Sequence, residues 1–90
     1  MTRKRQRIDI IRDMLSSVRE HRGEIKPTHL MYRSNLSHTQ MKGYLEELIS
    51  SELIQKVTHD NHEYIIITGR GIKLLKKLKE MHEFEKAFGI

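Results

Sequence analysis

The spacing of hydrophobic residues changes along this chain of 90 residues, and that change constrains the fold more than any other feature. Up to about residue 50 the apolar side chains recur every three or four residues, the period of an amphipathic helix. The runs LIQKV (53–57) and YIIIT (64–68) are instead short and rich in β-branched residues, which favours strands. From Ile72 onward the helical period returns. The predicted order is therefore helices, a pair of strands and a long helix.

Three helices are predicted ahead of the strands. The first has apolar residues at helical spacing and ends near Gly23; these residues are Ile8, Ile11, Leu15 and Val18. Pro27 suits the first turn of a second, short helix at 28–34, because the N–H that proline lacks has no partner there in any helix. The third helix keeps the same period through its apolar residues, which are Met41, Tyr44, Leu45, Leu48 and Ile49.

A tight turn separates the second and third helices. Asn35 tolerates the left-handed backbone conformation, and Leu36 can fill the angle between the two helices. Ser37 is expected to cap the third helix, and Gln40, three residues later, completes the pattern of a capping box. Two helices joined in this way form a helix-turn-helix.

The β-branched runs flank the polar stretch THDNHE (58–63), which predicts a β-hairpin. We place Asp60 and Asn61 at its tip, and Thr68 or Gly69 at its end. The following helix is expected from about Gly71 to Phe88. Its first half should pack on the core near the first helix through Leu74 and Leu75.

This order of elements predicts an α+β fold that is mostly helical. It is a winged helix-turn-helix, with three helices, a β-hairpin wing and a long C-terminal helix. We divide the chain into a basic N-terminal arm at 1–7, the winged helix-turn-helix domain at 8–70 and a C-terminal dimerisation helix at 71–90.

The chain is basic, with a formal net charge of +5 and a pI near 9.7. Such a charge indicates a polyanionic partner or simply solubility. The absence of cysteine excludes disulfides and thiolate zinc sites. The sequence has no secretory signal and no apolar run of the roughly 20 residues that span a bilayer. We therefore expect no membrane association, and a cytoplasmic protein associated with the nucleoid.

Catalytic or cofactor sites are not indicated by the sequence. It has no glycine-rich phosphate loop, nucleophile elbow or carboxylate cluster. His59 and His62 have the spacing of two metal ligands, but the sequence fixes no third ligand beside them. We expect no enzymatic activity, no cofactor and no metal site.

The third helix has a polar face at its N-terminal half. In a winged helix-turn-helix this half can enter the major groove of DNA, where side chains reach the base edges. At ~100° per residue, two of the polar positions lie opposite the apolar stripe and two lie on either side. The residues predicted to contact bases are Thr39, Gln40, Lys42 and Gly43. Gln can pair with adenine, Thr can touch a thymine methyl and glycine permits close approach; the alternative is an ordinary solvated face.

Contacts with the DNA backbone are expected to supply most of the affinity. The candidates lie in the arm, the second and third helices and the wing; they are Arg3, Lys4, Arg5, Arg7, Tyr32, Arg33, His38, His59, Asn61 and His62. For the arm, the alternative is a solvated tail. In the wing, Asp60 and Glu63 dilute the positive charge.

The far half of the last helix carries apolar residues that one chain has difficulty covering. Exposure of its two phenylalanines to water would be costly, so we predict a homodimer through this helix. The predicted interface consists of Ile10, Met14, Leu74, Leu78, Met81, Phe84 and Phe88. The alternative is that this end folds back across the first helix and covers Ile10 and Met14 within one chain.

Two stretches of the chain carry a family resemblance: KPTHLMYRSNLSHTQMKGYLEELISSELI (26–54) and YIIITGRGIKLL (64–75). They resemble the small archaeal winged-helix DNA-binding proteins of the Sulfolobus 10a type, over roughly residues 8–80. The matching positions are Lys26, Thr28, His29, Met31, Tyr32, Asn35, Leu36, Tyr44, Leu45, Leu53, Ile54, Tyr64, Thr68 and Gly71. Glu52 stands where the family usually has glycine, so we expect the third helix to be capped differently.

The resemblance implies a DNA-binding homodimer joined by an antiparallel coiled coil, acting in transcriptional regulation or chromosome organisation. We therefore predict a dimeric regulator that binds double-stranded DNA through its third helix in the major groove. The alternatives are a winged-helix protein-interaction module and a nucleoid-organising protein with little sequence specificity. RNA binding is disfavoured because the sequence lacks the aromatic surface on which single strands stack.

Overall fold

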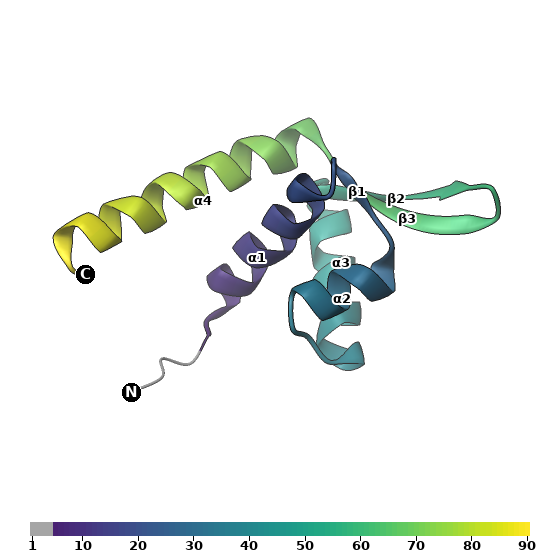
Figure 1. Ribbon diagram of the computed structural model, residues 1–90, viewed down its shortest axis with the longest axis horizontal. Coiled ribbons are helices and arrows are strands. Elements are labelled where there is room, and N and C mark those ends of the chain that lie inside the picture. Colours follow the sequence, from purple (N-terminus) through teal and green to yellow (C-terminus); the bar gives the residue numbers. More distant parts are fainter. Residues whose placement is uncertain (1–4) are drawn as a thin grey trace.

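The computed structural model describes residues 5–90 and has the predicted winged helix-turn-helix fold (Figure 1). The elements in order are α1 (Arg7–Glu20), β1 (Glu24–Ile25), α2 (Pro27–Arg33), α3 (His38–Ser50), β2 (Ile54–His59), β3 (His62–Ile67) and α4 (Gly69–Phe88). The β2–β3 hairpin projects from one side of the helical body, and the far end of α4 projects from the other. Arg7, which we placed at the end of the arm, is the first residue of α1.

The three strands form one antiparallel sheet in the order β1-β3-β2. β2 and β3 pair from Ile54↔Ile67 to His59↔His62, and Asp60 and Asn61 form the turn between them. Both turn residues have positive φ, +50° and +63°, as the tight hairpin turns that match the twist of the strands require. The predicted hairpin tip is confirmed. β1 was not predicted, because a strand of two residues is too short to carry a hydrophobic period.

The turn between α2 and α3 forms as the sequence predicts. Asn35 has a φ of +55°, and Leu36 is buried. The backbone N–H of Gln40 donates to Ser37 Oγ over 3.2 Å, and the N–H of Ser37 donates to Gln40 Oε1 over 3.1 Å. This reciprocal capping box fixes the start of α3 and therefore the direction of its polar face.

The C-terminal cap of α3 does not differ from a glycine cap in the way we expected from Glu52. Glu52 adopts the left-handed conformation, with a φ of +61°, that glycine would adopt without strain. Its N–H donates to Ile49 O over 3.0 Å, and the N–H of Leu53 donates to Leu48 O over 2.9 Å. These are the two hydrogen bonds of a Schellman cap. The expectation was wrong because the cap is formed by backbone hydrogen bonds, in which the side chain of residue 52 takes no part.

The start of α4 is tied to this cap through Thr68. Its hydroxyl donates to the carbonyl oxygens of Glu52 and Leu53, at 2.7 and 3.0 Å, and accepts the N–H of Gly71 over 2.9 Å. Gly71 packs so closely that a Cβ there would overlap with the Leu53 carbonyl oxygen. α4 consequently begins at Gly69, slightly before the predicted start.

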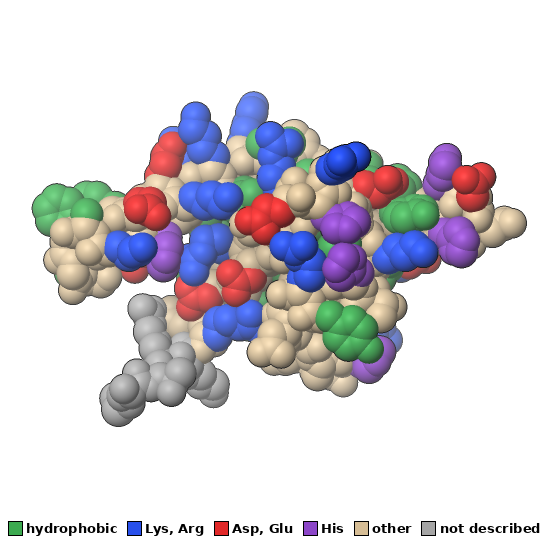
Figure 2. All heavy atoms as spheres, viewed as in Figure 1, with side chains coloured by type: hydrophobic (Ala, Val, Ile, Leu, Met, Phe, Trp, Pro, Cys, Tyr) green, Lys and Arg blue, Asp and Glu red, His purple; other side chains and the backbone are tan. Residues whose placement is uncertain are grey.

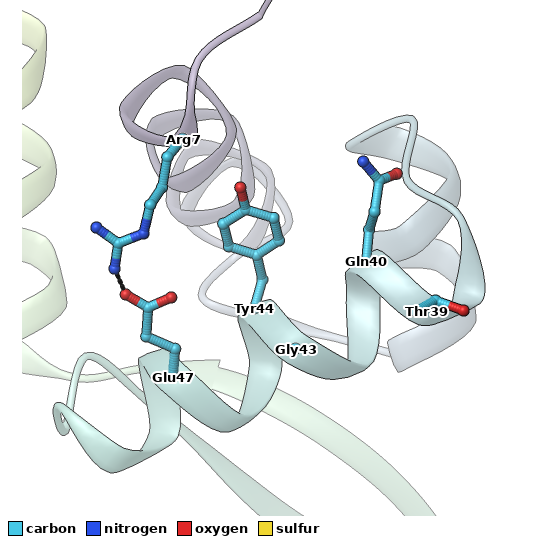
Figure 3. Close-up of a pocket in the computed structure, with 6 residues that line it drawn as sticks. All are labelled: Arg7, Thr39, Gln40, Gly43, Tyr44 and Glu47. Atoms are coloured by element: carbon cyan, nitrogen blue, oxygen red, sulfur yellow. Dashed lines mark ion pairs between the residues drawn. The ribbon is translucent and has the colours of Figure 1, made fainter.

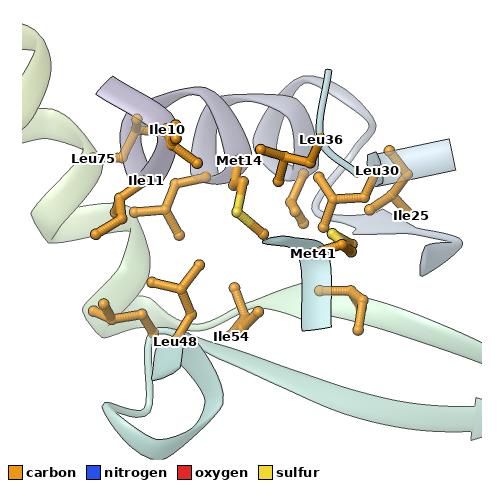
Figure 4. Packing of buried hydrophobic residues seen from close by; sticks show 14 of the residues in the cluster. Ile10, Ile11, Met14, Ile25, Leu30, Leu36, Met41, Leu48, Ile54 and Leu75 are labelled. Carbon is orange, nitrogen blue, oxygen red and sulfur yellow. The ribbon is translucent and has the colours of Figure 1, made fainter. Parts of the chain in front are cut away.

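The hydrophobic core lies between α1, α2, α3, the base of the sheet and the first half of α4 (Figure 4). Leu15, Val18, Leu30 and Ile65 are fully buried at its centre. Leu75 is buried in the same cluster and Leu74 packs on its edge, as predicted for the first half of α4. The core therefore fixes the helix-turn-helix against both the hairpin and α4.

Packing of α1 against α4 corrects the predicted dimer interface. Ile10, Met14 and Leu78 are only 6%, 1% and 5% exposed, and they belong to the core of the single chain. Contact between α1 and α4 covers them within one chain, as the alternative of a fold-back across the first helix expected for Ile10 and Met14. Ile8, expected on the apolar stripe, is instead 43% exposed.

The far half of α4 extends beyond this core and keeps an apolar surface. Met81, Phe84 and Phe88 are 57%, 57% and 69% exposed, and the two phenylalanine rings lie with centroids 4.7 Å apart. Within residues 5–90, none of the helices combines the length and the apolar character needed to cross a bilayer.

Candidate nucleic-acid interface

All four residues predicted to contact bases lie on the exposed surface of α3. Thr39, Gln40, Lys42 and Gly43 are exposed, whereas Met41 between them is buried. No other group lies within 4 Å of the position that a Cβ would occupy at Gly43. The N-terminal half of α3 is thus an open polar surface backed by the core.

A shallow groove runs along one edge of this surface (Figure 3). It has a volume of about 330 Å³ and is lined by Arg7, Thr39, Gln40, Gly43, Tyr44 and Glu47. Arg7 at the start of α1 forms an ion pair with Glu47, and Tyr44 projects between Arg7 and Gln40. The ion pair neutralises the carboxylate nearest the groove. Sequence reasoning missed this pair, which joins residues 7 and 47 across two helices.

The side chain of Gln40 caps α3 and is also predicted to contact a base. Its side-chain oxygen already accepts the N–H of Ser37, while its NH₂ group has no hydrogen-bond partner among the described residues. A bidentate contact with adenine needs both the oxygen and the NH₂ group. The second lone pair of the oxygen is available for such a contact, but the capping box restricts the orientations that the side chain can adopt.

Two further guanidinium groups predicted to contact the DNA backbone are paired within the chain. Arg5 Nη1 lies 3.0 Å from Asp13 Oδ2, and Arg5 Nη2 donates to Asn35 O over 3.1 Å. Arg33 Nη2 lies 3.0 Å from Glu20 Oε2. Because exposed ion pairs are worth about 0–1 kcal/mol, these guanidinium groups can exchange a carboxylate for a phosphate at small cost. Arg3 and Lys4 lie outside the described residues.

The remaining predicted backbone residues are exposed but dispersed. Tyr32 on α2 is 73% exposed, and His38 is exposed at the start of α3. His59, Asn61 and His62 lie at the far end of the hairpin, where His59 Nδ1 is 3.4 Å from Asp60 Oδ2. Among residues 5–90, no three potential metal-ligating side chains come together.

One cluster of basic side chains was missed by sequence reasoning. A pocket between the end of α1, β1, α2 and β3 is lined by His21, Arg22, Glu24, Lys26, His29 and Tyr64, among others. Helical or strand periodicity could not group these residues, because they come from four elements. The clue in the sequence was local: Arg22 precedes a glycine, and Lys26 precedes the proline that starts α2.

Comparison of the sequence with models of protein families agrees with this fold, in which a hairpin projects from a helix-turn-helix and α3 has an exposed polar face. A family model described as winged helix-turn-helix matches residues 4–86. The chain belongs to the winged helix-turn-helix family. No curated protein matches it at a significant level.

Solved structures of this family share the fold. Sso10a-2, a DNA-binding protein from Sulfolobus solfataricus, matches with a TM-score of 0.80 and 19% identity over 93% of this chain and 85% of that chain. F93 from STIV, a winged-helix DNA-binding protein, matches with a TM-score of 0.69 and 18% identity over 92% of each chain. The predicted resemblance to the Sulfolobus 10a type is thereby confirmed in the fold.

The likeness also extends to larger regulators. A MarR family transcriptional regulator from Silicibacter pomeroyi DSS matches with a TM-score of 0.75 and 18% identity, over 89% of this chain but only 53% of that chain. The chain thus spans about half the length of this regulator. At these identities the likeness concerns the fold, and the surfaces of this chain have to be interpreted from its own residues.

Proposed function

We propose that this winged helix-turn-helix protein binds duplex DNA by placing the N-terminal half of α3 in the major groove. The observation that carries the proposal is the open surface at Gly43, with Thr39, Gln40 and Lys42 beside it. The major groove is about 12 Å wide and admits a helix, most closely where side chains are small. The DNA-binding proteins of similar fold give this proposal further support.

The charge distribution along α3 supports entry by its N-terminal end. Lys42 is exposed and has no ion-pair partner among the described residues, whereas Glu46 is exposed further along the helix. Glu47 is neutralised by Arg7, so Glu46 is the carboxylate that would repel phosphates. A helix entering end-on keeps Glu46 away from the groove while Lys42 reaches it.

We propose that the protein acts as a homodimer, joined through the far half of α4. Met81, Phe84 and Phe88 form an exposed apolar surface beyond the core, and a second copy of the helix could cover it. Two α3 helices on one side of a duplex would match half-sites about one helical turn apart. A dimeric transcriptional regulator associated with the nucleoid is the function that fits these features best.

An architectural role with little sequence specificity is the second candidate. The capping box of Gln40 favours an architectural role, because it restricts the orientations in which this side chain could pair with a base. A protein-docking role has less support. The exposed large hydrophobic side chains of residues 5–90 lie on α1, α2, α4 and the C-terminal end, and α3 has none of them.

The test is an anisotropy titration with a random duplex pool at two salt concentrations, followed by sequencing of the bound fraction. Gln40→Glu keeps the capping box but removes the NH₂ donor, so it should reduce the preference between best and average sites. The loss expected for a bidentate contact is about 1–3 kcal/mol. Because a carboxylate can accept from cytosine N4 but cannot pair bidentately with adenine, the quantity compared is the preference for adenine-containing sites. Arg33→Ala is the control, because a phosphate contact should weaken all sequences equally.

The outcomes separate the candidate functions. Affinity that falls steeply with salt, with a sequence preference that Gln40→Glu reduces, supports a regulator that reads bases through α3. Salt-dependent affinity without any preference supports the architectural role. Absence of binding to any duplex at low salt overturns the proposal.

A further inference from the structure

The pocket between α1, α2 and β3 gathers positive charge away from the polar face of α3. It has a volume of about 430 Å³ and is lined by two permanent cations, Arg22 and Lys26, and two histidines, His21 and His29. Neither cation has a carboxylate within ion-pair distance among residues 5–90. Glu24 is the one carboxylate that lines the pocket in the described part of the chain.

Both cations occupy positions where the local backbone favours another residue. Arg22 has a φ of +63°, in the left-handed region that glycine and asparagine tolerate best. Lys26 is the N-cap of α2 and makes no side-chain capping bond, at a position that suits serine, threonine, asparagine or aspartate. The conformation of Arg22 belongs to the C-terminal cap of α1, where the N–H of Gly23 donates to Val18 O over 2.9 Å. Each position accepts an uncharged polar residue at least as well, so both cations can be replaced without loss of the local backbone structure.

The two histidines are held in place at the same pocket. Their rings meet edge to face, with centroids 4.9 Å apart and an interplanar angle of 88°. His21 Nδ1 lies 2.7 Å from the carbonyl oxygen of Glu24, and because a carbonyl only accepts, Nδ1 carries the proton. In the neutral ring Nε2 of His21 is then an acceptor, and it can donate to a phosphate oxygen only in the imidazolium form. Half-buried Tyr64 also lines the pocket.

We infer that this pocket binds a phosphate group. Arg22 and Lys26 supply the charged donors that phosphate oxygens accept from, and an imidazolium ring or the Tyr64 hydroxyl can add further donors. The pocket joins α2, the first helix of the helix-turn-helix, to the hairpin strand β3, so a phosphate of a bound duplex is one source. Figure 2 shows histidine and Lys or Arg side chains side by side where the helical body meets the hairpin. A free phosphate compound is the other source; the duplex source rests on the proposed function.

The variant that tests the pocket is Arg22→Asn with Lys26→Ser. Asparagine suits the left-handed backbone and serine can cap α2, so the melting temperature should stay equal or rise. The matched control is Lys76→Gln with Lys79→Gln, which removes the same charge from the exposed side of α4. If the double variant unfolds, Lys26→Ser alone replaces it, with Lys76→Gln alone as its control.

Duplex binding is measured by anisotropy over a range of salt concentrations. If the pocket holds a backbone phosphate, the variant should bind roughly tenfold more weakly than the control at 0.1 M salt, with a salt slope reduced by about 1. The second measurement is an NMR titration of the protein with inorganic phosphate at constant ionic strength. If the ligand is a free phosphate, the imidazole signals of His21 and His29 should shift and saturate in the control but not in the variant.

The two titrations test phosphate binding by the pocket independently of the proposed function. A duplex-affinity loss specific to the variant assigns the site to the DNA backbone, and phosphate-induced shifts without such a loss assign it to a free phosphate compound. Variant and control that behave alike in both titrations overturn the inference. If the unmodified protein binds no duplex, the proposed function fails, and the phosphate titration alone decides the pocket.

Discussion

Replacing Gly71 by alanine should destabilise the fold, although alanine is the better helix former. The Cβ of an alanine would overlap with the carbonyl oxygen of Leu53 and lie 2.8 Å from Cγ1 of Ile67. The first of these atoms belongs to the backbone and is held by the N–H and the hydroxyl of Thr68, at 3.1 and 3.0 Å. Relief of the overlap requires α4 to move away from the α3 cap.

The change in the free energy of unfolding is the sum of one stabilising and two destabilising contributions. Higher helix propensity favours alanine by about 1 kcal/mol. Overpacking of a close contact costs about 1–3 kcal/mol. Displacement of α4 also weakens the cap in which Thr68 accepts the N–H of Gly71, and such a cap is worth about 1 kcal/mol. We expect Gly71→Ala to lower the free energy of unfolding by about 1–3 kcal/mol.

The same substitution at Gly43 is the matched control. Gly43 is also inside a helix, but a Cβ there meets no atom within 4 Å, so Gly43→Ala should raise stability by up to about 1 kcal/mol. Denaturant unfolding of both variants, followed by circular dichroism, measures the difference. The reasoning is refuted if Gly71→Ala is as stable as the unmodified protein, or if both alanines shift stability in the same direction.

Three further substitutions test other parts of the account. Glu52→Gly should raise the free energy of unfolding by about 1 kcal/mol, because glycine takes up the φ of +61° without strain; a destabilised variant would contradict this cap. Ser34→Ala should leave stability unchanged or raise it by up to about 1 kcal/mol, because the buried Ser34 Oγ has no hydrogen-bond partner among the described residues; a larger loss in thermal unfolding would reveal one. Met81→Glu with Phe84→Glu should give monomers in sedimentation experiments, and an unchanged dimer mass would place the interface elsewhere.

Features specified by neighbouring residues could be predicted from the sequence. Ser37 and Gln40 are close enough in the chain to form their capping box in any helix that starts there. Asp60 and Asn61 suit the positive φ angles that a tight hairpin turn requires. These local signals placed α3 and the wing, and with them the polar face of the candidate interface.

Features that depend on distant parts of the chain could not be predicted. The sequence pattern could not tell whether Ile10 and Met14 are covered by the last helix of the same chain or by a second copy. In the structure both are buried within one chain. The ion pairs of Arg7 with Glu47 and of Arg33 with Glu20 join separate elements, so no spacing rule predicts them.

Residues that violate local preference were informative only once the fold was known. Arg22 and Glu52 both adopt left-handed backbone conformations. At Glu52 the backbone bonds of the helix cap account for the conformation. At Arg22 the N–H of the next residue, Gly23, donates to Val18 O over 2.9 Å, so a helix cap accounts for this conformation too. The side chain of Arg22 also lines the basic pocket, which its backbone conformation alone does not reveal.

The measurement that tests the central claim most directly is an NMR titration of the ¹⁵N-labelled protein with a short duplex. If α3 enters the major groove by its N-terminal half, the largest shifts of backbone amide signals should fall on Thr39, Gln40, Lys42 and Gly43. The amide of Glu46 should shift less, because the C-terminal half of the helix stays outside the groove. Shifts concentrated on α4, with the signals of 39–43 unchanged, would contradict the account.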